Sequence, residues 1–154
     1  MQPPRILVRV AVTAFQTLRR AFWFVTRPDV RGVLAVPVTP EGKVVLVRLT
    51  YDKGWHLPGG GLKGGEDPEA AILRELKEEI GLTAHGEVLC LGEFQHRPDR
   101  RRGRSTLFLV KGVRYEFRQS LEIEELGAFA PDALPPGTTS LTAKKIAQAL
   151  SPPH

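Results

Sequence analysis

Residues 60–82 constrain the fold of this 154-residue chain more than any other stretch. A glycine-rich loop runs directly into a segment with helical periodicity. Asp67 is a favourable N-cap, Pro68 suits the first helical position, and Gly81 can adopt the left-handed conformation that ends a helix. The pattern therefore predicts a helix between Asp67 and Gly81. Its expected buried stripe is Leu73, Leu76 and Ile80.

Three carboxylates crowd onto another side of this predicted helix: Glu75, Glu78 and Glu79. Like charges one turn apart destabilise a helix by roughly 0.2–0.5 kcal/mol per pair. Glu78 and Glu79 also fall in the last turn, where the helix dipole disfavours negative charge. A divalent cation would reverse these penalties. Oxygen ligands without a nearby cysteine favour Mg²⁺ or Mn²⁺ over Zn²⁺, and a solvated acidic face is the alternative.

The spacing of these residues resembles the Nudix box, G-x5-E-x7-R-E-U-x-E-E-x-G-U, in which U is a bulky aliphatic residue. Gly60, Glu66 and the run RELKEEIGL over 74–82 match every fixed position. A pattern of this length is far more specific than a glycine loop alone. The resemblance implies an α/β fold, a Nudix-type α/β/α sandwich around a mixed β-sheet.

The resemblance also implies a metal site. Glu75, Glu78 and Glu79 would bind Mg²⁺ or Mn²⁺ in a protein of this family. The sequence Pro-Gly-Gly before the helix is similar to the family's lead-in, so the carbonyl of Gly59 would be a further ligand. The bound ion would stabilise charge on phosphate oxygens and activate a water molecule.

Two further roles follow from the resemblance. Arg74 would orient the carboxylates, with Glu66 as its ion-pair partner. The general base would be a box carboxylate, Glu75 or Glu79, or else Glu122. The segment around Glu122 is similar to a Nudix tail, with an alanine where an aromatic residue is usual, and a plain charged loop is its alternative.

The chain divides into an N-terminal segment 1–28, a Nudix domain 29–150 and a short tail 151–154. Residues 1–28 contain arginines and no acidic residue, and they predict an extra basic amphipathic helix. This helix would pack on the domain or on a second subunit, which makes a homodimer plausible. A membrane-surface helix and a targeting peptide are the alternatives.

Apolar runs predict strands over 29–39 and 43–49, joined as a hairpin at 40–42. Further strands are expected over 86–95 and 104–110, the second extending toward residue 117. A closing amphipathic helix is expected over 138–150, and its expected buried residues are Leu141, Ile146 and Leu150.

The single cysteine, Cys90, excludes an internal disulfide framework and is expected in the core. A reducing compartment, the cytoplasm, is therefore expected. Since 18 consecutive uncharged apolar residues never occur, we expect no transmembrane helix.

Substrate contacts are expected outside the box. The run 96–104 is rich in arginine, and Arg97, Arg102 and Arg104 could pair with phosphates. A solvated hairpin tip is the alternative, and no aromatic residue interleaves with these arginines, so specific nucleic-acid binding is not expected. His56 is a further substrate candidate, with a structural role as its alternative.

We therefore expect divalent-metal-dependent hydrolysis of a diphosphate bond in a nucleoside diphosphate linked to another group, such as a nucleotide sugar or ADP-ribose. The net charge of +5 suits such an anionic small molecule. Pyrophosphohydrolysis of oxidised nucleoside triphosphates is one alternative. A non-catalytic nucleotide-binding or regulatory module of the same fold is another. An isomerase acting on isopentenyl diphosphate is a third, for which Cys90 would be the candidate acid–base cysteine.

Overall fold

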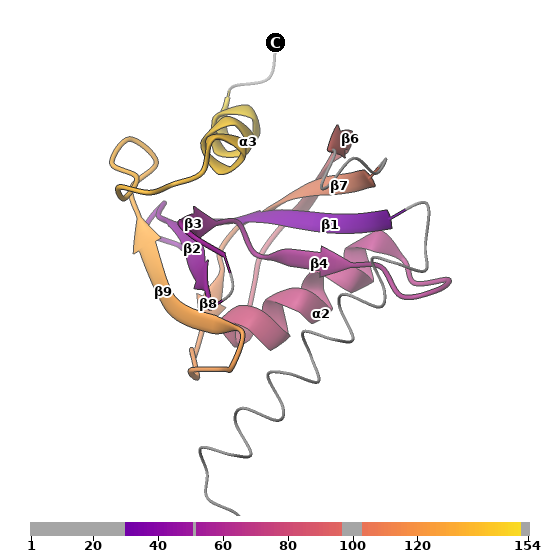
Figure 1. Ribbon diagram of the computed structural model, residues 1–154, viewed down its shortest axis with the longest axis horizontal. Coiled ribbons are helices and arrows are strands. Elements are labelled where there is room, and N and C mark those ends of the chain that lie inside the picture. The colour runs from indigo at the N-terminus through magenta and orange to yellow at the C-terminus, as the bar shows by residue number, and fades with distance from the viewer. Residues whose placement is uncertain (1–29, 51, 97–102, 152–154) are drawn as a thin grey trace, which may run out of the picture.

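The computed structural model of the protein describes residues 30–50, 52–96 and 103–151 (Figure 1). The predicted N-terminal helix and the substrate candidates Arg97 and Arg102 lie outside these residues. Within the described ranges, no helix is long and apolar enough to cross a membrane.

The described strands form three sheets, and two helices pack against them. The first sheet has the order β4-β1-β7-β6 and is mixed, because β1 and β7 run parallel while the other pairs are antiparallel. The second, antiparallel sheet has the order β3-β2-β9, and the third pairs β5 with β8. The strands are β1 (Val30–Pro37), β2 (Val44–Leu49), β3 (Trp55–His56), β4 (Gly59–Gly61), β5 (Leu82–Ala84), β6 (Val88–His96), β7 (Gly103–Val110), β8 (Arg114–Tyr115) and β9 (Ile123–Phe129). The helices are α2 (Pro68–Ile80) and α3 (Ser140–Leu150).

The two helices lie on opposite sides of the sheets, as Figure 1 shows. Alternate residues of β1 face the two sides, so Val33 and Ala35 join the core on the α2 side, while Val36 joins the core on the α3 side. This arrangement confirms the predicted α/β/α sandwich around a mixed sheet.

The hairpin expected at 40–42 is correct at its turn and wrong for the strands beyond it. A tight turn does form, because the Gly42 N–H donates to the Thr39 carbonyl at 2.9 Å and one bridge joins Val38 to Val44. The two strands then part and enter different sheets, β1 beside β7 and β2 beside β9. Both strands are apolar on both faces, and each lies inside its own sheet rather than at an edge.

The predicted extension of β7 toward residue 117 is also wrong. The chain turns at Gly112, which has a φ of +64°, and residues 114–115 pair as β8 with β5. This turn carries the segment after β8 back to the C-terminal end of α2, where the Glu116 N–H donates to the Gly81 carbonyl at 2.9 Å.

Helix α2 forms as predicted. The Asp67 carboxylate accepts a hydrogen bond from the Ala70 N–H at 3.2 Å, and Gly81 ends the helix in the left-handed conformation. Leu76 and Ile80 are fully buried, and each such side chain stabilises the fold by roughly 1.5–3 kcal/mol. Leu73 is only partly buried, and Ala71 and Ile72 complete the buried face instead.

Helix α3 forms within the predicted range, but of the three residues expected to be buried only Ile146 is buried. Thr142, Ile146 and Ala149 are buried, whereas Leu141 and Leu150 are 44% and 38% exposed. Leu141 lies about 140° around the helix from Ile146, because each residue advances by about 100°. The two side chains therefore cannot share one face.

Cys90 is exposed, which corrects the expectation that it lies in the core. Strand β6 is the edge of its sheet, and the pairing register shifts between Cys90 and Gly92. Leu89 and Leu91 point to the α3 side and pack on its core. Cys90 points to the other face, where the described elements leave this edge uncovered.

The close approach at the end of α2 predicts a large effect of Gly81→Ala. A Cβ there would lie 2.1 Å from the Glu116 carbonyl oxygen, and the φ of +74° is unfavourable for alanine. We expect a loss of about 1–3 kcal/mol in the free energy of unfolding, measured by urea denaturation. Gly64→Ala is the control, because a Cβ at Gly64 meets nothing within 4 Å. Equal losses in the two variants would contradict the prediction.

Candidate functional site

The glycines of β4 lie directly against the carboxylates of α2. A Cβ at Gly60 would lie only 2.3 Å from Oε1 of Glu75, and a Cβ at Gly59 would lie 2.2 Å from the Val33 carbonyl oxygen. Any larger residue at either position would have to displace its neighbours. Gly60 thus lets β4 approach the Glu75 carboxylate of α2 closely, and Gly59 lets β4 approach β1.

Glu75 and Glu79 are both buried, at 7% and 6% exposure, although they carry carboxylates. They are separated by one helical turn and lie on the same side of α2. The Gly59 N–H donates to Oε2 of Glu79 at 3.2 Å. Burial of two carboxylates so close together is costly unless hydrogen bonds or cations compensate for the lost water.

Arg74 supplies much of that compensation. Its Nε and Nη2 donate to the two oxygens of Glu66, both at 2.9 Å, in a bidentate pair. Nη1 donates to Glu75 at 3.0 Å and to Glu78 at 3.4 Å, and Nη2 also donates to the Gly61 carbonyl at 3.2 Å. All five N–H groups of the guanidinium therefore donate hydrogen bonds. These bonds join the loop before α2, at Gly61 and Glu66, to α2 itself.

The pair between Arg74 and Glu66 changes how both groups titrate. The hydrogen bond from Arg74, together with that from the Lys63 N–H, lowers the pKa of the Glu66 carboxyl from about 4.5 to about 2. The same bond raises the pKa of Arg74 further above its ordinary value. Both groups therefore stay charged at any physiological pH.

Glu78 differs from its two neighbours, because its side chain is 57% exposed and contacts Arg74 at the long distance of 3.4 Å. Among the described residues, no three acidic, histidine or cysteine side chains are placed together closely enough to hold a metal ion. The fold thus gathers Glu75 and Glu79 and leaves Glu78 at the surface. The ligand set of the box stays a prediction.

Glu122 lies half-buried directly before β9. Its carbonyl accepts a hydrogen bond from the Thr50 N–H at 3.0 Å, and the Thr50 hydroxyl donates to the Leu121 carbonyl at 3.0 Å. These bonds fix the backbone of the segment against the end of β2. A role for Glu122 as a base or metal ligand stays a prediction.

The other substrate candidates are spread apart. His56 donates from Nε2 to the Lys53 carbonyl at 2.9 Å and lies 3.6 Å from the Asp52 carboxylate, so its ring is tied to the preceding turn. Arg104 is exposed near the start of β7, where its register neighbour is Arg31. Substrate binding by either residue stays a prediction.

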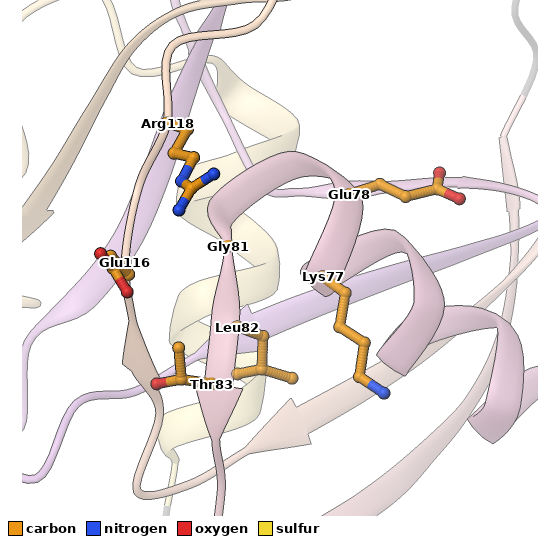
Figure 2. A pocket seen from close by; sticks show the side chains of 7 residues that line it. All are labelled: Lys77, Glu78, Gly81, Leu82, Thr83, Glu116 and Arg118. Carbon is orange, nitrogen blue, oxygen red and sulfur yellow. The ribbon is translucent and has the colours of Figure 1, made fainter.

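A pocket that the sequence did not predict adjoins the end of the box helix (Figure 2). It has a volume of about 240 Å³ and brings together residues of α2, of β5 and of the segment after β8. No periodicity or motif links these stretches in the sequence. Its lining residues are Lys77, Glu78, Gly81, Leu82, Thr83, Glu116 and Arg118.

The low pKa of Glu66 predicts how the stability of the protein depends on pH. A carboxyl whose pKa is lower in the folded state stabilises the fold above its unfolded pKa, and that contribution disappears as the pH falls from about 4.5 to about 2. Glu66→Gln should therefore be less stable than the natural protein at pH 6. The difference should shrink toward zero near pH 2. Denaturant titrations over this range measure it, and a difference independent of pH would contradict the prediction.

Comparisons with known proteins agree with this arrangement. The sequence model of the NUDIX domain matches residues 28–150. An RNA pyrophosphohydrolase of Hahella chejuensis (strain KCTC 2396) is 45% identical over 66 residues, which are 43% of this chain and 39% of that protein. The first curated relatives are matched over only 34–39% of their own lengths.

Two solved structures are similar over most of the described fold. A MutT NUDIX hydrolase from Burkholderia pseudomallei has a TM-score of 0.68 and 27% identity, over 78% of this chain and 97% of that chain. A UDP-X diphosphatase has a TM-score of 0.64 and 30% identity, over 79% of this chain and 62% of that chain. With the domain match over most of its length, this chain belongs to the NUDIX family.

Proposed function

We propose that this chain is a divalent-metal-dependent pyrophosphohydrolase that cleaves the diphosphate linkage of a nucleotide. The single observation that carries this proposal is the buried pair Glu75 and Glu79, closed against the backbone of Gly59 and Gly60. Two buried carboxylates of one helix are expensive as structural residues, and a bound cation would reverse that cost.

The side chains present suit a hard cation. Glu75, Glu79 and the backbone near Gly59 offer oxygen atoms, which Mg²⁺ and Mn²⁺ prefer. The side chain of Glu78 is 57% exposed and contacts Arg74, so packing restrains it less than the buried side chains of Glu75 and Glu79. When bound, the ion would supply charge stabilisation to the phosphate oxygens and lower the pKa of water.

The remaining steps would belong to the chain itself. A carboxylate would accept the proton of the attacking water, and we propose Glu79, Glu75 or Glu122 for this role. A bond would form between the water oxygen and phosphorus, and the bond from that phosphorus to the bridging oxygen would break. The two phosphate-bearing fragments would then leave with one water added between them. Arg74 would keep the box carboxylates in position, since it already bonds Glu75 and Glu78.

The substrate we propose is a nucleoside diphosphate linked to another group. The similarity to a UDP-X diphosphatase at 30% identity supports this class. RNA is a second candidate, because curated RNA pyrophosphohydrolases match part of this chain, and oxidised nucleoside triphosphates are a third. The box cannot separate them, since its residues would contact only metal, water and phosphate.

Hydrolysis is tested with a panel of such compounds and Mg²⁺, read by mass spectrometry in ¹⁸O-labelled water. We expect one labelled oxygen in the products of at least one compound. An isomerase would leave the mass unchanged, and a binding module would leave the compound intact. Either result across the whole panel would contradict the proposal.

Glu79→Gln tests the role of the buried pair. The amide keeps the shape of the side chain but removes its charge, so we expect a fold close to that of the natural protein and a loss of at least 10²-fold in Mg²⁺-dependent turnover. Circular dichroism checks the fold, and initial rates at saturating Mg²⁺ check the activity. Near-normal turnover of the variant would contradict a catalytic or metal-binding role of Glu79.

Gly60→Ala tests the same site without changing a charge. Its Cβ would push against the Glu75 carboxylate, so we expect Mn²⁺ affinity, measured by electron paramagnetic resonance of the free ion, to fall by roughly tenfold or more. Gly61→Ala is a matched control one residue away, because a Cβ at Gly61 meets nothing within 4 Å. Equal Mn²⁺ affinities in the two variants would contradict the prediction.

A further inference from the structure

The lead-in to the box, residues 54–59, is held at its start by a segment that is distant in the sequence. The Trp55 N–H donates to the Gly137 carbonyl at 2.9 Å, and the Thr139 N–H donates to the Trp55 carbonyl at 3.2 Å. An isolated parallel β-bridge thus joins β3 to the chain before α3, which passes beside it in Figure 1. Since β3 is an edge strand, residues 137–139 cover the side of Trp55 that faces away from β2.

The contact is closest at Gly54. A Cβ there would lie only 2.4 Å from the Gly137 carbonyl oxygen, and the two glycines have positive φ values of +91° and +86°. Trp55 is 8% exposed, and its ring packs edge-on against Phe129 with 5.0 Å between the ring centroids. Neither segment can therefore move away from the other without disturbing buried side chains.

The lead-in reaches the box at its other end, where the Gly59 N–H donates to Oε2 of Glu79 at 3.2 Å. The residues between Trp55 and Gly59 are restrained. Leu57 is 5% exposed in the core on the α3 side, and the ring of Pro58 fixes its φ. A displacement at the start of the lead-in would therefore be transmitted to the Gly59 N–H.

We propose that residues 137–139 position the Glu79 carboxylate for metal binding by fixing the lead-in that bonds it. Outer partners of this kind orient a ligand and so set the metal affinity of a site. The alternative is a contact that contributes stability alone, because the Ala35 N–H also holds the Pro58 carbonyl at 3.0 Å. This inference rests on the proposed function, in which Glu79 binds the metal ion.

Gly54→Ala tests the inference, with Gly42→Ala as the matched control. Gly42 has a similar φ of +83°, but a Cβ there meets nothing within 4 Å, so only Gly54→Ala adds a push on Gly137. In the metal-free protein, the Gly59 amide resonance in ¹H–¹⁵N NMR reports the bond to Glu79. We expect this resonance to move in Gly54→Ala and to keep its position in Gly42→Ala. A lower urea midpoint for Gly54→Ala with an unmoved Gly59 resonance would overturn the inference.

Thr139→Pro, compared with Thr139→Ala, tests the same contact from the other side. Both variants lose the N-cap hydroxyl of α3, but only proline removes the N–H that donates to the Trp55 carbonyl. The φ of −67° at Thr139 suits proline. We expect Mn²⁺ affinity, measured by electron paramagnetic resonance of the free ion, to be roughly tenfold weaker in Thr139→Pro than in Thr139→Ala.

The two measurements separate this inference from the proposed function. Equal Mn²⁺ affinities in Thr139→Pro and Thr139→Ala would assign residues 137–139 to stability alone and overturn the inference. If the natural protein binds no Mn²⁺, the proposed function fails. The Gly59 resonance in Gly54→Ala and Gly42→Ala then still decides whether residues 137–139 position the Glu79 carboxylate.

Discussion

The hydrogen bonds of Arg74 couple the loop and the helix that make up the candidate site. The guanidinium contacts three carboxylates, those of Glu66, Glu75 and Glu78, and also the Gly61 carbonyl. One positive charge cannot balance three negative ones, so the cluster keeps an excess of negative charge. Removal of Arg74 would leave Glu75 buried without its cation, which is more costly than the loss of an exposed ion pair.

Close backbone packing, rather than side-chain packing, brings the elements of the site together. Gly60 lets β4 reach the Glu75 carboxylate, and Gly81 lets the end of α2 reach the segment after β8. Both contacts leave no room for a Cβ, and both join a short strand or loop to the same helix. The helix α2 is therefore clamped at two points, and its buried apolar face fills the core between them.

Sequence reasoning succeeds where the determining interactions are local. Three such interactions lie within one loop and the helix that follows it, so the residue spacing predicts them. They are the N-cap at Asp67, the C-terminal end of the helix at Gly81 and the ion pair between Glu66 and Arg74. It fails where partners are distant. Apolar runs indicate that β1 and β2 are strands, but they do not say that the two enter different sheets. The exposure of Cys90 likewise depends on which strand forms the sheet edge.

The same distinction separates the box carboxylates from the pocket at the end of α2. The carboxylates come from consecutive turns of one helix, so any sequence that keeps this helix keeps their arrangement. Lys77 and Arg118 face one pocket only because β8 pairs with β5 and Glu116 bonds Gly81. Since the segment after β8 is exposed at Arg118 and contributes nothing to the box motif, its side chains can change without disturbing Glu75 or Glu79.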